Sequence, residues 1–472
     1  MAILRAHPRI QAGQSHTGRT LELLLLGASS IVVVAALIIV EAAQSQGISW
    51  DLAKYFAAYL VMFGLAHMAV RRFAPYADPL ILPIVATLNG LGLVVIHRLD
   101  LGSGSNTAGG AASTSSDANQ QVMWTVLALV IFVGVLAVLR DHRTLSRYSY
   151  LLGVGGIGFL AIPIMLPASM SEINGSKNWI KTGYFNIQPG EFSKILIIIF
   201  TAALLVAKRD LFTTAGKHFL GMDLPRLRDL APLLIAWVVA IGVFAIENDL
   251  GQPLLIFTTI LALLYVATER ISWVVIGVIL FTAGALLAYQ LFPHLQVRVQ
   301  IWQDPFKYFN DIGYQPSQAL FGLATGGLFG TGLGSGRPNI VPFANTDFIV
   351  SSIGEELGLV GLAAVLMLYL VLIARGLRTG ITVRDSFGKL LATGLAFSIA
   401  AQLFVIVGGV TKLIPLTGVT TPFLSYGGSS LLANYILVAI LLRVSNAARE
   451  PDSARPAGPT IANANTQVVG RP

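Results

Sequence analysis

Apolar segments of about 17 to 25 residues recur from residue 23 to residue 444, separated by short polar stretches. An α-helix needs about 20 apolar residues to cross the hydrocarbon core of a bilayer, so this pattern predicts an all-α polytopic membrane protein. A transmembrane β-barrel would instead show alternating segments of about ten residues. Asp, Glu, Lys and Arg make up only 11% of the chain, whereas soluble domains carry roughly 25%. A soluble globular enzyme is therefore excluded.

The apolar segments predict about twelve transmembrane helices. They lie near residues 23–43, 54–70, 79–97, 122–139, 148–167, 191–207, 230–247, 251–267, 271–291, 348–374, 386–409 and 430–446. Residues 1–20 and 448–472 are expected to be cytoplasmic tails, the second of them disordered. Residues 21–78 then carry two helices that precede a membrane core at residues 79–447.

The distribution of basic residues predicts the orientation. With a cytoplasmic N-terminus, about 22 of the 31 Lys and Arg residues lie on the cytoplasmic side, which agrees with the positive-inside rule. The net charge of +8 thus reflects topology, and nucleic-acid binding is not needed to explain it. This orientation places residues 169–188, 292–347 and 412–429 outside the cytoplasm. The absence of cysteine excludes disulfides and thiol nucleophiles.

The outer loop at residues 292–347 is unusually long for a compact membrane bundle. Such loops are usually functional or disordered, and its many aromatic residues, such as Trp302 and Tyr314, argue against disorder. Residues 318–328 are short and apolar on one side, which predicts an interfacial or re-entrant helix before the glycine-rich residues 326–336. The alternative is a loop that merely covers the bundle.

Ionisable groups at membrane depth cost about 2.5 to 3.5 kcal/mol each on insertion scales, so they need a partner or a task. Glu191 and Lys194 are three residues apart at the start of a span, close enough on a helix for an ion pair. The alternative to a functional role for this pair is therefore a structural one, in which the ion pair clamps the helix in place. Asp249 precedes a helix, where an N-terminal cap is the alternative to a functional role.

Asp347 ends the long outer loop at the start of a span, where a carboxylate can stay ionised and still face a cavity. On a continuous helix, Ser351 and Glu355 would lie within about 80° of Asp347, which predicts one acidic face. The alternative is an N-terminal carboxylate stabilised by the helix dipole.

Several cations share the outer side with Asp347: Lys177, Lys181, Arg298, Lys307, Arg337 and Lys412. Any one of them could simply contact lipid phosphate. A carboxylate, a basic set and glycine-rich backbone at one membrane face together suit an anionic, lipid-borne substrate, especially a diphosphate.

These features come in the order of a known family. Matching motifs occupy residues 174–180, 188–194, 249–251, 298, 304–305, 313–315, 318–320, 326–330, 332–334, 346–349, 354–358, 415–418 and 422–430. In them the chain resembles the SEDS family of bacterial cell-wall polymerases, which includes RodA and FtsW. The two preceding spans, together with residues 89–92 and 98–100, favour the RodA type. Asn178 stands where the family usually has Arg or Lys, Gly190 where Ser is common, and Asn345 where His is usual.

The resemblance implies a peptidoglycan glycosyltransferase. Its substrate would be lipid II, an undecaprenyl diphosphate that carries the disaccharide pentapeptide, polymerised at the outer face of the cytoplasmic membrane during elongation or division. Converting an α-linked diphosphate sugar into a β-1,4 glycoside is one inversion and needs a base for the acceptor hydroxyl. Asp347 matches the essential Asp of the family and is expected to be that base.

The resemblance also implies substrate-binding residues. Lys177 and Arg298 are expected to stabilise the leaving diphosphate, with Lys194 and Lys412 behind them. Trp179 matches a residue that the family needs and would stack on a sugar or seat the lipid, with an interfacial Trp as the alternative. Three further residues from matching motifs complete the set: Glu191, Glu355 and Ser425. A divalent cation, Mg²⁺ or Mn²⁺, would suit the diphosphate, and no organic cofactor is expected.

Two further expectations concern partners and rival functions. No Ser-x-x-Lys acyl-enzyme motif lies in a folded outer domain, so the resemblance implies a class B penicillin-binding protein as a separate transpeptidase. Its helix would pack against this bundle, and Gly354, Gly358 and Gly361 form a small-residue strip that serves either that contact or internal packing. The alternatives are a lipid II flippase, against which the lack of an inverted repeat argues, and a scaffold for division or elongation proteins.

Overall fold

The computed structural model describes residues 17–44, 50–102, 116–173, 175–183, 185–209, 217–219, 222–224, 238, 242, 247, 249 and 251–451. Its helices are α1 (Arg19–Ala43), α2 (Trp50–Phe73), α3 (Ile81–Gly102), α4 (Asp117–Val138), α5 (Thr144–Arg147), α6 (Ser149–Met165), α7 (Ala168–Ser171), α8 (Pro189–Ala207), α11 (Gly251–Thr268), α12 (Ile271–Leu291), α13 (Pro293–Gln303), α14 (Tyr314–Gly326), α15 (Ile349–Thr382), α16 (Ser386–Val410) and α17 (Gly428–Arg449). The 3₁₀ turns are η1 (Phe306–Tyr308) and η2 (Pro338–Ile340). Two short antiparallel hairpins complete the elements: β1 (Ile180–Lys181) with β2 (Asn186–Ile187), and β3 (Lys217–Phe219) with β4 (Met222–Leu224).

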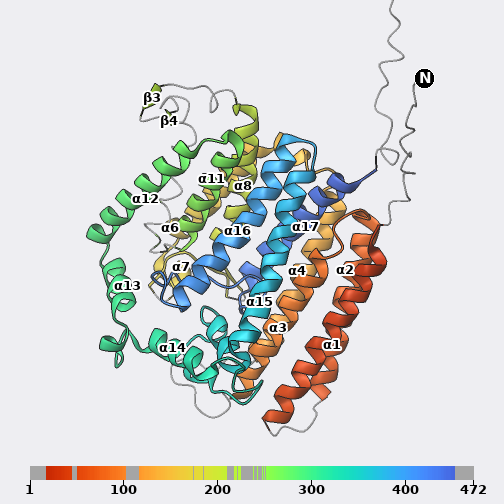
Figure 1. Cartoon of the computed structure of the whole chain (residues 1–472), viewed down its shortest axis with the longest axis vertical. Helices are drawn as coiled ribbons and strands as arrows, with labels where there is room; N and C mark the ends of the chain where they lie inside the picture. Colours follow the sequence, from red (N-terminus) through yellow and green to blue (C-terminus); the bar gives the residue numbers. More distant parts are fainter. Residues whose placement is uncertain are drawn as a thin grey trace, which may run out of the picture.

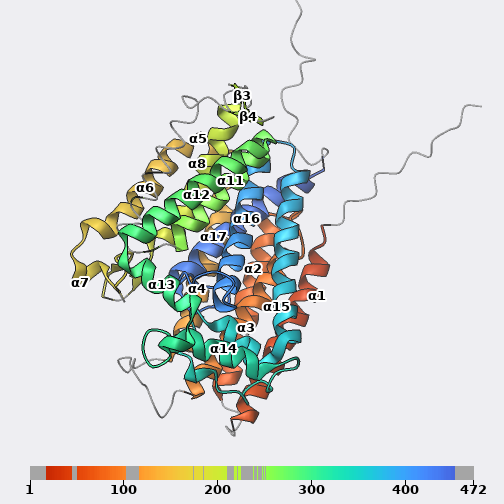
Figure 2. The same cartoon turned by 60° about the vertical axis from the view of Figure 1, so that its left-hand side comes forward.

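The predicted all-α membrane fold is confirmed. Within the described residues, ten helices are long and apolar enough to cross a membrane, and α6 is a shorter apolar helix of 17 residues. The span expected near residues 230–247 lies almost entirely outside the described residues, as do most of the two tails. Figures 1 and 2 show one bundle with α13 and α14 gathered at one end, here called the loop end. The end where α1 begins and α17 ends is called the tail end.

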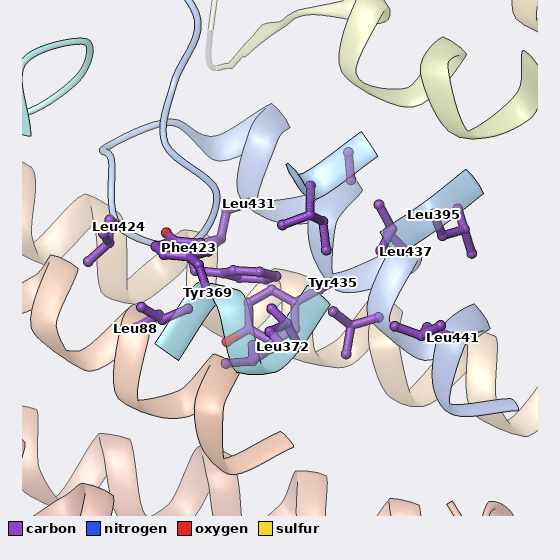
Figure 3. Packing of buried hydrophobic residues seen from close by; sticks show 14 of the residues in the cluster. Leu88, Tyr369, Leu372, Leu395, Phe423, Leu424, Leu431, Tyr435, Leu437 and Leu441 are labelled. Atoms are coloured by element: carbon purple, nitrogen blue, oxygen red, sulfur yellow. The ribbon is translucent and has the colours of Figure 1, made fainter. Parts of the chain in front are cut away.

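Aromatic packing at the centre of the bundle fixes the segment that runs over the loop end at residues 412–427. Tyr369 of α15 and Tyr435 of α17 are fully buried, and the ring of Phe423 lies 5.5 Å from that of Tyr435 (Figure 3). The Tyr369 hydroxyl donates to the carbonyl oxygen of Pro422. Residues 422 and 423 are thereby anchored in the core of the bundle.

The long loop is structured, as its aromatic content predicts, and it contains a helix where one was expected. That helix, α14, covers residues 314–326 instead of 318–328 and packs against α15. The glycine-rich segment that follows returns to α15 and bonds to its backbone, so it is part of the fold of the bundle.

A break in α15 explains the glycines of that segment. Gly358 has φ 68° and ψ −172°, so the helical hydrogen-bond pattern is interrupted there. The N–H of Leu359 donates to the carbonyl oxygen of Gly327 at 2.9 Å. A Cβ on Gly330 would lie 2.1 Å from the carbonyl oxygen of Glu356, so only glycine allows the two backbones to come this close.

The small-residue strip on α15 is used internally. A Cβ on Gly354 would meet the side chain of Leu323 at 2.4 Å, and one on Gly358 would meet the backbone nitrogen of Gly330 at 2.2 Å. For these two glycines the internal-packing interpretation is confirmed, because their space is filled by α14 and by the glycine-rich segment.

The two N-terminal helices are present as predicted, and α1 contacts the core at both of its ends. At the tail end, Arg19 pairs with Glu22 and its guanidinium donates to the carbonyl oxygen of Ala77. At the loop end, the side-chain amide of Gln44 donates to the carbonyl oxygen of Gly334 in the glycine-rich segment. Helix α1 thus spans the distance between the tail end and the loop that approaches α15.

Candidate active site

Asp347 lies in the turn before α15 and is half-buried. The hydroxyl of Ser425 donates to the carbonyl oxygen of Thr346 at 2.6 Å and accepts the N–H of Thr421 at 2.8 Å. The N–H of Tyr426 donates to the carbonyl oxygen of Asn345 at 2.8 Å. The segment that carries Asp347 is therefore held against residues 421–426, which the aromatic core anchors.

Asn345 supplies a second tie for this segment. Its side-chain amide donates to Asp117 at the start of α4, at 2.8 Å. Asn345 stands where the family usually has His, and a hydrogen bond to a carboxylate is one that a histidine N–H could also make. The amide thus keeps a link between the Asp347 turn and α4.

The surroundings of Asp347 raise its pKa to about 6. Burial is the main cause, because it disfavours the charged form, while the guanidinium of Arg298 opposes the shift and the carboxylate of Asp249 adds to it. No group in the described part of the chain donates a hydrogen bond to this carboxylate. An ionised Asp347 at neutral pH is thus a stronger proton acceptor than an ordinary aspartate.

Arg298 of α13 lies beside the same turn. Its Nη1 donates to the carbonyl oxygens of Leu416 and Thr417, at 3.3 Å and 3.1 Å. A Cβ on the next residue, Gly418, would lie 3.7 Å from Oδ2 of Asp347. The turn at residues 416–418 thus lies close to both the guanidinium of Arg298 and the carboxylate of Asp347. Arg298 Nε and Nη2 make no hydrogen bond with the described residues and are available to an anion.

Asp249 connects the predicted motif at residues 174–180 with the site formed by Asp347 and Arg298. The side-chain amide of Asn178 donates to Oδ2 of Asp249 at 2.8 Å, and the N–H of Gly251 donates to Oδ1 at 3.0 Å. The second contact is the capping role that was the alternative for Asp249. Asn174 of the same motif lies outside the described residues.

Lys177 and Trp179 flank Asn178 and are both half-buried. The Nζ of Lys177 donates to the carbonyl oxygen of Ile164 at 3.0 Å, and its backbone N–H to Glu247 at 2.9 Å. Lys177 also directly precedes Asn178, the residue that donates to Asp249. Binding of substrate by Lys177 and Trp179 stays a prediction.

Glu191 and Lys194 form a buried ion pair within a hydrogen-bonded network. They are 1% and 2% exposed, and Lys194 Nζ lies 2.7 Å from Glu191 and 2.8 Å from Oε1 of Gln402. Gln252 donates to the other oxygen of Glu191 at 2.6 Å, and Gln402 donates to the carbonyl oxygen of Thr420 at 2.8 Å. Through Gln402 the network supports the segment at residues 416–421, which contacts Arg298 and the Asp347 turn. This role fits the structural-clamp alternative.

Two of the predicted residues lie apart from this group. Lys412 is exposed, has φ 62°, and accepts a hydrogen bond from Trp302 at its carbonyl oxygen. Glu355 is buried and accepts the backbone N–H of Arg337 at 2.6 Å. The acidic face expected on one helix is only partly formed, because α15 begins at Ile349 and Asp347 precedes it.

A buried ion pair between α3 and α15 was not predicted. Arg98 and Glu356 are each 3% exposed, and Arg98 Nε lies 2.9 Å from Glu356. Arg98 also donates to the carbonyl oxygen of Gly336 at 2.7 Å, while Glu356 accepts the N–H of Gly334 at 3.0 Å. The pair therefore fixes the glycine-rich segment. The available signal was an arginine directly at the end of the span predicted at residues 79–97.

The donor set does not fit a resident divalent cation. In the described ranges, no group of three or more His, Asp or Glu side chains is arranged to hold a metal. Mg²⁺ prefers several oxygen ligands, whereas the described residues bring the carboxylates of Asp347 and Asp249 to this site. A divalent cation at the diphosphate therefore stays a prediction.

Comparison with known proteins gives a consistent result. The sequence profile of the cell cycle protein family of FtsW, RodA and SpoVE matches residues 79–450. The chain is 59% identical to the peptidoglycan glycosyltransferase RodA of Mycobacterium tuberculosis over 456 residues, 96% of either chain. It is 34% identical to the stage V sporulation protein E of Bacillus subtilis over 70% of this chain and 87% of that one. The crystal structure of the rod shape determining protein RodA of Thermus thermophilus has the same fold, with a TM-score of 0.54 at 23% identity, over 80% of this chain and 98% of that one.

Proposed function

Since the chain belongs to the cell cycle protein family of FtsW, RodA and SpoVE and is a peptidoglycan glycosyltransferase, we propose that Asp347 is the general base with which it polymerises lipid II. The observation that carries this assignment is the half-buried Asp347 carboxylate, held in place through its neighbours and lacking a hydrogen-bond donor in the described part of the chain. The likeness to RodA over nearly the whole chain supports the RodA type over FtsW.

The reaction is a single displacement at the anomeric carbon. The bond between this carbon and the diphosphate oxygen breaks, a bond to the acceptor hydroxyl oxygen forms, and the hydroxyl proton passes to Asp347. The diphosphate leaves without a strong acid. Arg298 stabilises its growing negative charge through the N–H groups that the turn at residues 416–418 leaves unused, and Lys177 adds a second cation.

The loop end is proposed to face outward, with both termini in the cytoplasm. The last turn of α2 carries Arg71 and Arg72 at the tail end, and Arg449 pairs there with Asp78. Basic residues concentrate on the cytoplasmic side of membrane proteins. This orientation gives Asp347 access to lipid II on the side of the membrane where the cell wall is built.

We further propose a transpeptidase partner of the class B penicillin-binding type. A solved structure with the same fold is described as a peptidoglycan synthase complex that coordinates polymerization and crosslinking, with a TM-score of 0.55 at 23% identity over 86% of this chain and 99% of that one. Since Gly354 and Gly358 are filled from within, the partner helix would dock on another face of the bundle.

Purified protein incubated with lipid II tests the proposed function. Chains of glycan that disappear on digestion with a muramidase are the expected product. Movement of labelled lipid II between leaflets without any chain growth would instead support the flippase alternative and contradict the proposal.

The pH dependence of kcat/KM should report the Asp347 carboxyl, because only its ionised form accepts a proton. With a pKa of about 6, activity should fall as the pH is lowered through 6. Arg298→Ala removes the charge that lowers this pKa, so the acidic limb should move to higher pH. Asp249→Asn removes the charge that raises it, so the limb should move to lower pH. Initial rates at limiting lipid II between pH 5 and 8 check this, and shifts in the same direction would contradict it.

Cations at the two ends of the bundle should differ in their importance. Lys177→Ala and Arg298→Ala should each lower kcat/KM for lipid II by about 10-fold to 100-fold, as expected for a charge-assisted bond to phosphate. Arg378→Ala is the matched control, because Arg378 is exposed near the tail end of α15, whereas Arg375 lies 3.6 Å from Asp78. Equal effects of Arg378→Ala and Arg298→Ala would contradict the location of the diphosphate site.

A further inference from the structure

A cavity of about 280 Å³ lies between α14, η2, the glycine-rich segment and α15. It is separate from the group formed by Asp347, Arg298 and Asp249, none of which lines it. Its lining combines one aromatic ring with hydroxyl, amide and charged side chains and includes Gln318, Phe321, Gly322, Thr331, Arg337 and Glu355. The cavity is therefore polar on several sides, and its apolar lining comes from Phe321, Ile340 and Val341.

Glu355 is the principal polar group of this cavity. It is 6% exposed, and its Oε1 accepts the backbone N–H of Arg337 at 2.6 Å. Its Oε2 accepts no hydrogen bond from the described residues and lies beside Gly322, where a Cβ would be only 3.0 Å away. Gly322 thus leaves open the space next to an acceptor that has no partner.

Phe321 provides the aromatic part of the apolar lining. Its ring is 46% exposed and stacks on Phe306, with the ring centroids 5.4 Å apart. This contact holds the ring and leaves part of its surface open. A fixed aromatic surface beside hydrogen-bonding side chains suits a ligand that is apolar on one face and rich in hydroxyl groups at its edge.

We propose that this cavity is a saccharide subsite that binds one sugar ring of the glycan, away from the diphosphate. Hydroxyl or acetamido N–H groups of the sugar donate to Glu355 Oε2, and one face of the ring lies on Phe321. The volume is at the small end of the roughly 300 to 1,000 Å³ typical of small-molecule sites, which limits the occupant to about one ring. The proposal rests on the proposed glycosyltransferase function and adds a second binding site to it.

The cavity at Glu355 differs in charge from the proposed diphosphate site at Arg298, and a short stretch of chain links the two sites. The Glu355 oxygen that accepts no hydrogen bond from the described residues attracts neutral donors and repels phosphate, and the positive charge of Arg337, which also lines the cavity, offsets part of this repulsion. Ile340 and Val341 line the cavity, and the chain runs from them directly to the Asp347 turn. The six residue steps from Val341 to Asp347 span at most about 20 Å, so a glycan of several rings can extend from the cavity to the reaction site while its charged end stays near Arg298.

The test measures binding of a soluble probe to the purified full-length protein in lipid nanodiscs. The probe is a tetrasaccharide of alternating N-acetylglucosamine and N-acetylmuramic acid, without lipid or diphosphate. Gly322→Ala, which fills the space beside Oε2, and Glu355→Gln, which keeps the size of the side chain, should each weaken binding by about 10-fold or more. Alanine is also the better helix former, so the first change does not act by weakening α14.

Two controls make the result specific. Gly134→Ala adds a methyl group to α4 where nothing lies within 4 Å, and it should leave tetrasaccharide binding unchanged. Asp347→Asn should also bind the tetrasaccharide like the wild-type protein, although its rate of polymerisation is strongly lowered. As a second readout, both cavity variants should make shorter glycan chains for each lipid II consumed.

The possible results separate the two proposals. Wild-type protein that does not bind the tetrasaccharide, or unchanged binding in both Gly322→Ala and Glu355→Gln, would overturn the subsite. Because Glu355→Gln is nearly isosteric, it decides the matter if Gly322→Ala fails to fold. Wild-type protein that binds the tetrasaccharide but polymerises no lipid II would contradict the proposed function and support the cavity as a glycan site.

Discussion

Replacement of Asp347 by asparagine is expected to lower the rate of lipid II polymerisation by about 100-fold to 10,000-fold, the usual contribution of a general base. Asparagine keeps the size and polarity of the side chain but cannot accept the acceptor hydroxyl proton. The turn should keep its conformation, because its ties run through the backbone of Thr346 and the side chain of Asn345. Lipid II binding should remain close to that of the wild-type protein.

The measurement is the initial rate of glycan formation by purified protein, with lipid II binding determined separately. Asp311→Asn is the matched control, because Asp311 is an exposed aspartate in the same loop. It should leave the rate near that of the wild-type protein. Full polymerase activity of Asp347→Asn would remove this residue from the mechanism, and a similar loss in Asp311→Asn would point to a general effect of the loop charge.

Removal of Arg98 should be the most damaging change to stability. In Arg98→Ala, Glu356 stays buried without its ionic partner, which typically costs about 3 to 5 kcal/mol. The glycine-rich segment would also lose the hydrogen bond at Gly336. Unfolding of the purified protein in mixed micelles of mild detergent and sodium dodecyl sulfate should show this loss of free energy.

Two variants test whether the unpaired charge is the cause. Arg98→Met combined with Glu356→Leu removes both charges, and it should be more stable than Arg98→Ala because apolar replacement of a buried pair is often neutral. Arg378→Ala removes an exposed arginine and should change little. A double variant as unstable as Arg98→Ala would show that the hydrogen bonds to the glycine-rich segment, and not the buried charge, dominate.

The sequence predicts the spans well because hydropathy is a local property. The apolar segments match the helices to within a few residues over most of the chain, and the outer loop contains its predicted helix at α14. The break at Gly358 could not be predicted, because the apolar segment that contains it is continuous. The break is stabilised by backbone bonds from residues about 30 positions earlier, such as Gly327 to Leu359.

The sequence predicted individual residues of the candidate site, but it did not predict the hydrogen bonds that link them to other helices. Asp347 and Arg298 were identified, and the structure brings both to the turn at residues 416–418. Glu191 and Lys194 were expected near substrate, but the contacts that satisfy them come from Gln252 and Gln402 on other helices. Such partners are distant in sequence, and spacing along one helix does not reveal them.

The break in α15 also bears on how the protein tolerates bilayers of different thickness. At a rise of about 1.5 Å per residue, the 24 residues from 359 to 382 extend roughly 36 Å, somewhat more than the hydrocarbon core of about 30 Å. A helix that is too long for its bilayer adapts by tilting. The glycine-rich segment bonds to the backbone of α15 on both sides of the break, at Glu355 and Glu356 before it and at Leu359 and Val360 after it. The loop therefore holds the break and the first turn beyond it in place. Hydrophobic mismatch would then be taken up by the part of α15 beyond Val360, while the depth of Asp347 stays constant.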